Sequence, residues 1–430
     1  MNYQEASNYL MQRLPMFQNV GGAAFKAGLE RITWLCEALG NPQNQFKSIH
    51  IAGTNGKGSS SHFLASILQE SGYKTGLTTS PHLKSFTERI RVNGVEIEET
   101  AFAHFVAHHQ KLIEDSEASF FEVGIAMAFW YFAEKQIDIG VIETGLGGRL
   151  DATNIIKPIV SLITNIGFDH QSFLGNTLPE IAQEKAGIIK NNTPVIISEH
   201  HSETKQVFLN KAQQEKAPTY FAEDFYKILN SKISLDTLNM NVQNLSNFEE
   251  ISIQSGLLGN YQLKNVLGVL KTVEILRETG VQISEENLKN GLKNVVKNTN
   301  LKGRWQILQE NPKVIADTAH NFNGIEQVLE QIRQTPHKQL HFVLGFMKDK
   351  DVNKILPLYP TEAQFYFCKP KLPRAMELTV LQEKAEQMGI KYISIEDVNM
   401  ALEIAISRAN DKDLILVGGS TFVVAEIKNL

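Results

Sequence analysis

The first half of the chain alternates short, continuous apolar runs with segments of helical periodicity. Parallel strands covered by helices on both faces are apolar along their whole length, so this alternation predicts a doubly wound parallel sheet. A helix is expected over 62–72, directly after the first apolar run. The predicted strands lie at 48–54, 75–80, 138–145, 157–166 and 193–198.

A second series of strands and helices begins near residue 313. It predicts a Rossmann-like α/β domain, with strands at 313–320, 339–346, 364–370, 391–395 and 413–422 and helices at 323–334, 379–389 and 398–410. The polar stretch 296–304 is the expected linker, which divides the chain into domains 1–297 and 298–430. Residues 200–255 are more polar, and we expect short strands and loops there.

Composition narrows the class of protein only a little. The chain has 430 residues and a formal net charge of -5, which gives no reason to expect nucleic-acid binding. It contains no apolar run long enough to span a membrane, and its first residues lack the apolar core of a signal peptide. The two cysteines, Cys36 and Cys368, form no CxxC motif, so a cytoplasmic protein without disulfides is expected.

A glycine-rich turn with one lysine follows the first predicted strand. A strand, such a turn and then a helix can cradle phosphate through backbone N–H groups and the helix dipole, and Lys57 would add a positive charge. A plain glycine turn is the alternative. Gly58 stands where the GK[ST] pattern has the hydroxyl that holds magnesium. The predicted phosphate loop comprises Gly53, Thr54, Asn55, Gly56, Lys57, Gly58 and Ser59.

Polar residues at the ends of later strands are candidates for holding magnesium. Glu143 ends an apolar strand beside a GLGG turn, and ligands bind at this end of open α/β sheets. Ser80 follows another strand, although a Ser-Pro pair can also simply end one. Asp169 and His170 likewise follow the end of a third predicted strand.

One lysine lies in an apolar helical stripe. Thr177 and Glu180 predict a capping box that starts a helix, and Lys185 falls on the same face as Ile181. Lys185 could extend its amine to solvent, or it could be buried with a lowered pKa and a reactive neutral amine. Glu122, in another apolar run, is expected to be a helix-end or hydrogen-bonded buried acid.

Three polar residues in the second half are candidates for nucleotide contacts. Arg304 lies just past the expected linker, and Asp317 and His320 follow a predicted strand. Such groups could close over a nucleotide bound to the first domain. A surface arginine and a helix N-cap are equally compatible with the pattern.

These motifs occur together in an order that resembles folylpolyglutamate synthase/dihydrofolate synthase, a branch of the Mur ligase superfamily. The matching blocks are AGTNGKGS, TSPHL with ERI after it, ETGLGGRLDATN, ITNIGFDHQSFLGNTLPEIAQEKAGIIK, GNYQLKN and DTAHN, and the resemblance covers nearly the whole chain. The sequence differs from the family pattern at Thr318 and Phe322, where the family has Gly and Pro. It also differs at Lys302, where the family has Pro.

The resemblance implies an ATP-dependent amide ligase that joins L-glutamate to dihydropteroate and to folates through an acyl phosphate. It implies two Mg²⁺ sites, one held by Ser80 and Glu143 and the other by His170 and a carbamylated Lys185. Catalytic roles then fall to Lys57, Glu143, His170 and Lys185.

Further roles follow from the same resemblance. Asn265, Arg304, Asp317 and His320 would face ATP, residues 80–91 would form a loop near the pterin, and the C-terminal domain would lie on the glutamate side. The expected protein is a monomer.

Three other classes of protein fit this sequence less well. A muramyl-peptide ligase would use a UDP-sugar peptide acceptor, and the TSPHL and EKAGIIK blocks argue against it. A P-loop GTPase or kinase would need the GK[ST] hydroxyl. A non-catalytic nucleotide-binding module would be expected to have lost Lys57, Glu143 or His170, which are all present.

Overall fold

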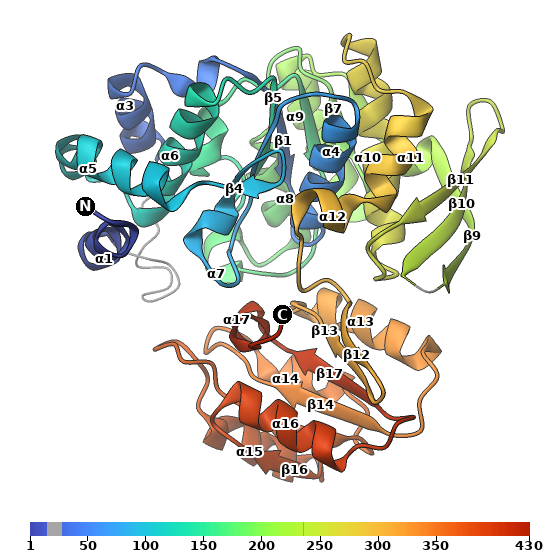
Figure 1. Cartoon of the computed structure of the whole chain (residues 1–430). Helices are drawn as coiled ribbons and strands as arrows, with labels where there is room; N and C mark the ends of the chain where they lie inside the picture. Colours follow the sequence, from blue (N-terminus) through green and yellow to red (C-terminus); the bar gives the residue numbers. More distant parts are fainter. Residues whose placement is uncertain (15–27, 235) are drawn as a thin grey trace. The chain divides into compact units, whose positions relative to one another are not determined.

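The computed structural model describes residues 1–14, 28–234 and 236–430, which form two compact units (Figure 1). The first comprises 1–256 and 262–300, and the second comprises 257–261 and 301–430. The division near the expected linker therefore falls at 300/301 rather than 297/298. The segment 257–261 differs from the expectation more, because its Leu258 is buried in the core of the second unit.

An eight-stranded sheet forms the centre of the first unit, in the order β4-β3-β2-β5-β1-β6-β7-β8. All pairs from β2 to β8 are parallel, which confirms the predicted doubly wound sheet, and β3 and β4 add an antiparallel edge. The strands are β1 (Lys47–Ala52), β2 (Thr75–Thr78), β3 (Ile90–Val92), β4 (Val95–Glu96), β5 (Ile139–Glu143), β6 (Val160–Ile163), β7 (Val195–Ile197) and β8 (Thr219–Phe221).

Helices cover both faces of this sheet, which explains why its central strands are apolar throughout. Ile163 packs in a cluster with α8 (Leu178–Ala186) and α9 (Ser202–Glu215), whereas its neighbour Leu162 lies against Gly268 of α10 (Gln262–Glu278). The other helices in the described part of this unit are α1 (Tyr3–Arg13), α3 (Glu30–Ala38), α4 (Lys57–Glu70), α5 (Glu99–Asp115), α6 (Phe120–Glu134), α7 (Gln171–Leu174), α11 (Glu285–Lys293) and α12 (Val295–Thr299).

The strands expected over 200–255 are present, but the expectation missed a helix. The segment begins with the regular helix α9, whose buried residues form a narrow stripe of Thr204, Phe208 and Ala212 on an otherwise polar sequence. After β8, a three-stranded antiparallel sheet follows, built from β9 (Tyr226–Ser234), β10 (Thr237–Asn244) and β11 (Glu250–Ser255).

The second unit contains a six-stranded sheet in the order β12-β13-β17-β14-β15-β16. Its strands from β13 to β16 are parallel, as predicted, and β12 is an additional antiparallel edge. The strands are β12 (Gln306–Glu310), β13 (Lys313–Ala316), β14 (Leu340–Leu344), β15 (Gln364–Phe367), β16 (Tyr392–Ser394) and β17 (Leu414–Gly418). The helices are α13 (Phe322–Gln334), α14 (Val352–Ile355), α15 (Leu378–Gln387), α16 (Val398–Arg408) and α17 (Thr421–Glu426).

Across the described ranges of the chain, the helices are too short or too polar to cross a membrane.

Candidate active site

Four neighbouring strands of the first unit end at the same edge of the sheet. The register pairs Ile51 of β1 with Glu143 of β5, and Ala52 of β1 with Ile163 of β6, while β2 is the other neighbour of β5. Segments that are far apart in the sequence are thus brought together at the end of the sheet where ligands bind in such folds. The loops at this edge carry the phosphate loop (53–59), Ser80, Glu143, Asp169 and His170.

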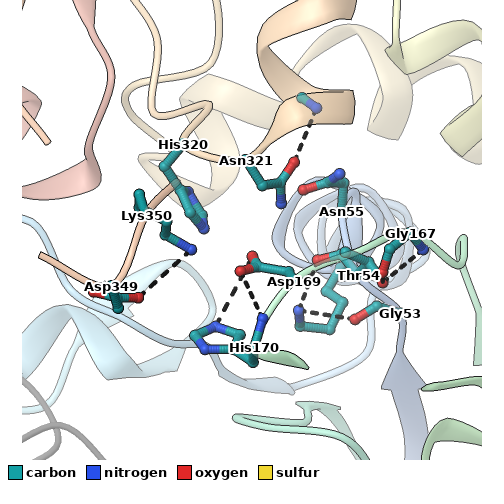
Figure 2. A network of polar contacts seen from close by, with 12 residues as sticks. Gly53, Thr54, Asn55, Gly167, Asp169, His170, His320, Asn321, Asp349 and Lys350 are labelled. Atoms are coloured by element: carbon teal, nitrogen blue, oxygen red, sulfur yellow. Dashed lines mark hydrogen bonds and ion pairs between the residues drawn. The ribbon is translucent and has the colours of Figure 1, made fainter. Parts of the chain in front are cut away.

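The phosphate loop connects β1 to α4 and is held by the loop after β6. Gly56 adopts the left-handed conformation, with φ 83°, immediately before the helix. The Thr54 hydroxyl donates to the Gly167 carbonyl at 3.1 Å and accepts from the Gly167 N–H at 3.0 Å (Figure 2). The Asn55 N–H donates to the Asn165 side chain at 2.8 Å. The loop therefore has a defined backbone shape, as phosphate binding by N–H groups requires.

Two lysines converge on one backbone carbonyl in this loop. The Lys57 amine donates to the carbonyls of Gly53, at 3.1 Å, and of Thr54, at 3.2 Å. The Lys185 amine donates to the same Gly53 carbonyl at 2.8 Å, and its side chain is 3% exposed. The alternative in which Lys185 extends its amine to solvent is therefore wrong.

Burial, reinforced by the nearby positive charge of Lys57, lowers the pKa of Lys185 to about 7. The carboxylates of Asp169 and Asp151 act in the opposite direction. A large share of this amine is consequently neutral at physiological pH, and a neutral amine is a nucleophile. The predicted capping box of Thr177 and Glu180, which starts the helix that carries Lys185, is present.

Asp169 and His170 lie in the loop after β6 (Figure 2). The Asp169 carboxylate accepts the His170 N–H at 2.9 Å, and its other oxygen lies 3.9 Å from His170 Nε2. His170 has a left-handed backbone, with φ 49°, and caps the short helix α7. The carboxylate and the imidazole are therefore neighbours at the sheet edge, and each can bind a cation.

On the other side of β1, Ser80 and Glu143 line one small pocket. The Ser80 N–H donates to Glu143 Oε2 at 3.1 Å, and Glu143 is 5% exposed. The remaining lining residues mix polar groups with an apolar wall and are Thr78, Thr79, Arg89, Phe121, Gly124 and Ile125. A buried carboxylate beside a serine at a strand end fits a hard cation such as Mg²⁺.

Within the described ranges, no three His, Cys, Asp or Glu side chains gather closely enough to form a complete metal site. Mg²⁺ commonly binds one or two carboxylates and completes its shell with water and substrate phosphate oxygens. The residues here suit that partial kind of site rather than a closed protein cage.

Asn265 lies directly against the phosphate loop. A Cβ atom at Gly56 would be 2.2 Å from the Asn265 side-chain oxygen. The amide of Asn265 donates to Gln262 at 2.8 Å, and Gln262 donates to the Ser59 hydroxyl at 3.1 Å. This chain of hydrogen bonds connects the start of α10 to the first turn of α4.

The candidates in the second unit occupy the turn after β13. Asp317 is 3% exposed and accepts hydrogen bonds from the Tyr261 hydroxyl at 2.6 Å, the Trp305 N–H at 2.8 Å and the Ala319 N–H at 2.8 Å. Burial raises its pKa despite these donors. With three donors from three segments, Asp317 fixes the local backbone.

Arg304 and His320 flank this buried carboxylate. The Arg304 guanidinium donates to the hydroxyl of Thr318, the residue that replaces the glycine of the family motif. The His320 ring nitrogen Nδ1 is 3.0 Å from the Thr318 carbonyl. Thr318 therefore holds the side chains of both candidates.

Three groups at the sheet edge have roles that sequence reasoning did not assign. Asn165 supports the phosphate loop, and Asp151 lies close enough to Lys185 to influence its pKa. Arg89 lines the pocket with Ser80 and Glu143. All three occur in or beside the quoted sequence blocks, but nothing in their spacing distinguishes them from ordinary loop residues.

Comparison with protein families gives two matches. Residues 51–273 match the Mur ligase middle domain, and residues 303–421 match the Mur ligase glutamate ligase domain. The chain belongs to the Mur ligase family.

Whole-chain relatives define the branch. The chain is 33% identical to the dihydrofolate synthase/folylpolyglutamate synthase of Bacillus subtilis, over 99% of this chain and 98% of the relative. It is 31% identical to that of Escherichia coli, over 98% and 96%. Within the Mur ligases, the chain belongs to the dihydrofolate synthase/folylpolyglutamate synthase family.

Solved structures agree with this assignment. Escherichia coli FolC in complex with DHPP and ADP superposes with a TM-score of 0.84 at 29% identity, covering 99% of this chain and 96% of the other. Mycobacterium tuberculosis folylpolyglutamate synthase complexed with ADP gives a TM-score of 0.88 at 28% identity, covering 98% and 96%. The two-domain α/β fold is therefore that of the family.

Proposed function

We propose that this protein is an ATP-dependent ligase that joins L-glutamate to dihydropteroate and extends folates with further glutamates. The supporting observation is the convergence of the phosphate loop, the Ser80–Glu143 pair and the Asp169–His170–Lys185 group on one sheet edge, in a chain that matches relatives of this name over its whole length.

The chemistry follows from the charges at this edge. An oxygen of the acceptor carboxylate attacks the γ-phosphorus of ATP, a new P–O bond forms, and the bond to the ADP oxygen breaks. The amino group of glutamate then attacks the acyl phosphate, an amide forms, and phosphate and a proton leave. Phosphoryl transfer depends mainly on positioning and charge neutralisation, which Lys57 and the loop N–H groups provide.

The residues present fit Mg²⁺. We assign the Glu143 carboxylate and Ser80 to one site, and His170 with a carbamylated Lys185 to a second. Bound Mg²⁺ supplies positive charge to the phosphate oxygens. Lys185, His170, Glu143 and Lys57 are the proposed catalytic residues.

Carbamylation of Lys185 agrees with its surroundings. The neutral amine would bond to the carbon of CO₂ and release one proton, which turns a cation into an anionic oxygen ligand. The carbamate keeps one N–H, and the Gly53 carbonyl 2.8 Å away is positioned to accept it. A buried lysine whose pKa is already lowered loses little by giving up its charge.

For the second unit we propose that Arg304, Asp317 and His320 serve the nucleotide and that residues 298–430 serve glutamate. Asn265 would take part from its position against the phosphate loop. The arrangement around Asp317 supports a preorganised turn that presents Arg304. We further propose a cytoplasmic monomer that acts on small molecules rather than on nucleic acid or membranes.

The test is phosphate release from ATP by the purified chain with glutamate and one acceptor at a time. Release is expected with dihydropteroate and with reduced folates. Release only with a UDP-sugar peptide would assign the chain to muramyl-peptide synthesis, and no release with any of these acceptors would refute a ligase function.

A second experiment tests the carbamate. Lys185→Ala should abolish turnover, and short carboxylates should restore part of it. Wild-type protein in isotopically labelled bicarbonate should show a carbamate carbon by NMR that is absent from the variant. An active Lys185→Ala protein would refute the carbamate.

A further inference from the structure

Arg89 is the cationic side chain of the pocket that contains Ser80 and Glu143. It ends the short helical turn Phe86–Arg89 and directly precedes β3, which pairs with β2. It is partly buried, and it is close enough to Glu143 for the two charges to interact.

The Arg89 guanidinium is held by a hydrogen bond at its Nε–H and by packing against two phenylalanine rings. Its Nε–H donates to Nδ1 of His82 at 2.8 Å, and its carbon lies 5.5 Å from the Phe86 ring centre and 5.9 Å from that of Phe120. Its two terminal nitrogens make no hydrogen bond to any other described residue. The end of the fork is therefore the part available to a ligand in the pocket.

The hydrogen bond from Arg89 defines the supporting role of His82. An imidazole accepts a hydrogen bond through one ring nitrogen, and here the acceptor is Nδ1, 2.8 Å from Arg89 Nε. A guanidinium keeps its proton in proteins, so Arg89 presents a positive charge to the pocket.

The positive charge of Arg89 would offset repulsion between the negatively charged groups that meet in this pocket. The acceptor carboxylate must approach both the phosphates of ATP and the Glu143 carboxylate, and like charges at such short range repel strongly. A planar cation with two free terminal N–H₂ groups matches a carboxylate in charge and in shape. The apolar wall, which includes Phe121 and Ile125, leaves Arg89 as the cation lining this pocket among the described residues.

We propose that Arg89 binds the reacting carboxylate of the acceptor, and the acyl phosphate formed from it, with His82 as the residue that positions the guanidinium. This inference rests on the proposed ligase function. Through the transfer, one carboxylate oxygen exchanges its negative charge for a bond to phosphorus, while the charge moves to ADP. The guanidinium can bind both states, because one terminal N–H can donate to the carbonyl oxygen while the other donates to an oxygen of the new phosphate group.

The test compares Arg89→Met, which keeps the packing on the two phenylalanine rings, with Arg89→Lys, which keeps a charge without the fork. Binding of a reduced folate is measured at equilibrium in the presence of a non-hydrolysable ATP analogue, together with KM and kcat for the acceptor. Arg89→Met should weaken acceptor binding by about 10-fold or more, and Arg89→Lys by about 5-fold. ADP binding should be unchanged in both.

Two controls separate binding from structure. Arg333→Met removes an exposed arginine of α13, whose partner is Glu330, and should leave all constants unchanged. His82→Phe should raise KM for the acceptor in the same direction as Arg89→Met but less, and His82→Gln, which restores an acceptor atom, should recover most of it. A purely structural His82 would change the melting temperature without this recovery.

The outcomes distinguish the two levels of the proposal. Wild-type protein that releases phosphate while both Arg89 variants bind the acceptor normally would overturn the role of Arg89 and leave the ligase function intact. Wild-type protein that neither binds folate nor releases phosphate would instead refute the proposed function.

Discussion

At the scale of single residues, the Gly53 carbonyl determines much of the chemistry of this site. It accepts hydrogen bonds from both Lys57 and Lys185, so two amines that would repel each other as cations are held close together. Lys57 remains partly exposed, whereas Lys185 is buried, and the cost of two adjacent charges therefore falls mainly on Lys185.

This cost predicts a pH-dependent stability effect of Lys185→Met. Burial lowers the pKa of Lys185 from 10.5 to about 7, so between these values the unfolded chain binds more protons at this site than the folded chain. The free energy of unfolding of the wild type should therefore rise with pH across this window, relative to the variant. In CO₂-free buffer, Lys185→Met should stabilise the protein by on the order of 4 kcal/mol near neutral pH and by much less near pH 10.

Urea denaturation at several pH values measures this difference. Lys264→Met, at an exposed lysine paired with Glu199, is the matched control and should show little effect at any pH. A stabilisation by Lys185→Met that did not change with pH would mean that the buried amine is not the cause.

At the scale of elements, the junction between β1 and α4 depends on a glycine for two separate reasons. Gly56 has φ 83°, which disfavours any residue with a Cβ, and a Cβ there would also lie 2.2 Å from the Asn265 oxygen. Gly72, just after the end of the same helix, has φ 85° but an open surrounding.

The two glycines give a matched pair of variants. Gly72→Ala should cost about 1 kcal/mol of stability and leave ADP binding unchanged, because only backbone strain is added. Gly56→Ala should cost more and weaken ADP binding by about 10-fold or more, because the loop must also move away from Asn265. Fluorescence titration with ADP and thermal melting measure both effects. Equal ADP affinity in the two variants would contradict this assignment of the loop.

Much of the sheet could be predicted from the sequence because buried parallel strands are continuous apolar runs. The polar residues at their ends, such as Glu143 and His170, could be placed at the site for the same reason. The helix α9 could not, because a stripe of three buried residues on a polar segment gives a weak periodic signal. Arg89 and Asp151 were missed since their importance depends on neighbours distant in sequence, namely Glu143 and Lys185.

At the scale of the whole molecule, the segment 257–261 links the two units in an unexpected way. Tyr261 donates to Asp317 in the second unit, while the next residue, Gln262, donates to Ser59 at the phosphate loop of the first. In the same segment, the Asn260 N–H donates to Gln331 of α13 at 2.7 Å. The chain therefore passes between the units at 256/257, 261/262 and 300/301.

Tyr261→Phe tests how much the second unit depends on this segment. The change removes one of three donors to a buried carboxyl group and should cost about 1–3 kcal/mol. Amide hydrogen exchange in β13 and α13 should become faster. Tyr73→Phe, which removes the phenol that accepts the Gln282 N–H within the first unit, should leave exchange in the second unit unchanged. Unchanged exchange in both variants would show that the segment contributes little.

The passage of the chain through 257–261 also limits how such proteins can be recombined. A chimera that took only residues 301–430 from a relative would pack foreign residues against Leu258 and Tyr261 and would pair Asp317 and Gln331 with partners selected in another background. The second unit is discontinuous in sequence, because it includes the five residues 257–261, which directly precede the helix that carries Asn265. Exchange of the C-terminal domain within this family should therefore succeed only when both pieces move together.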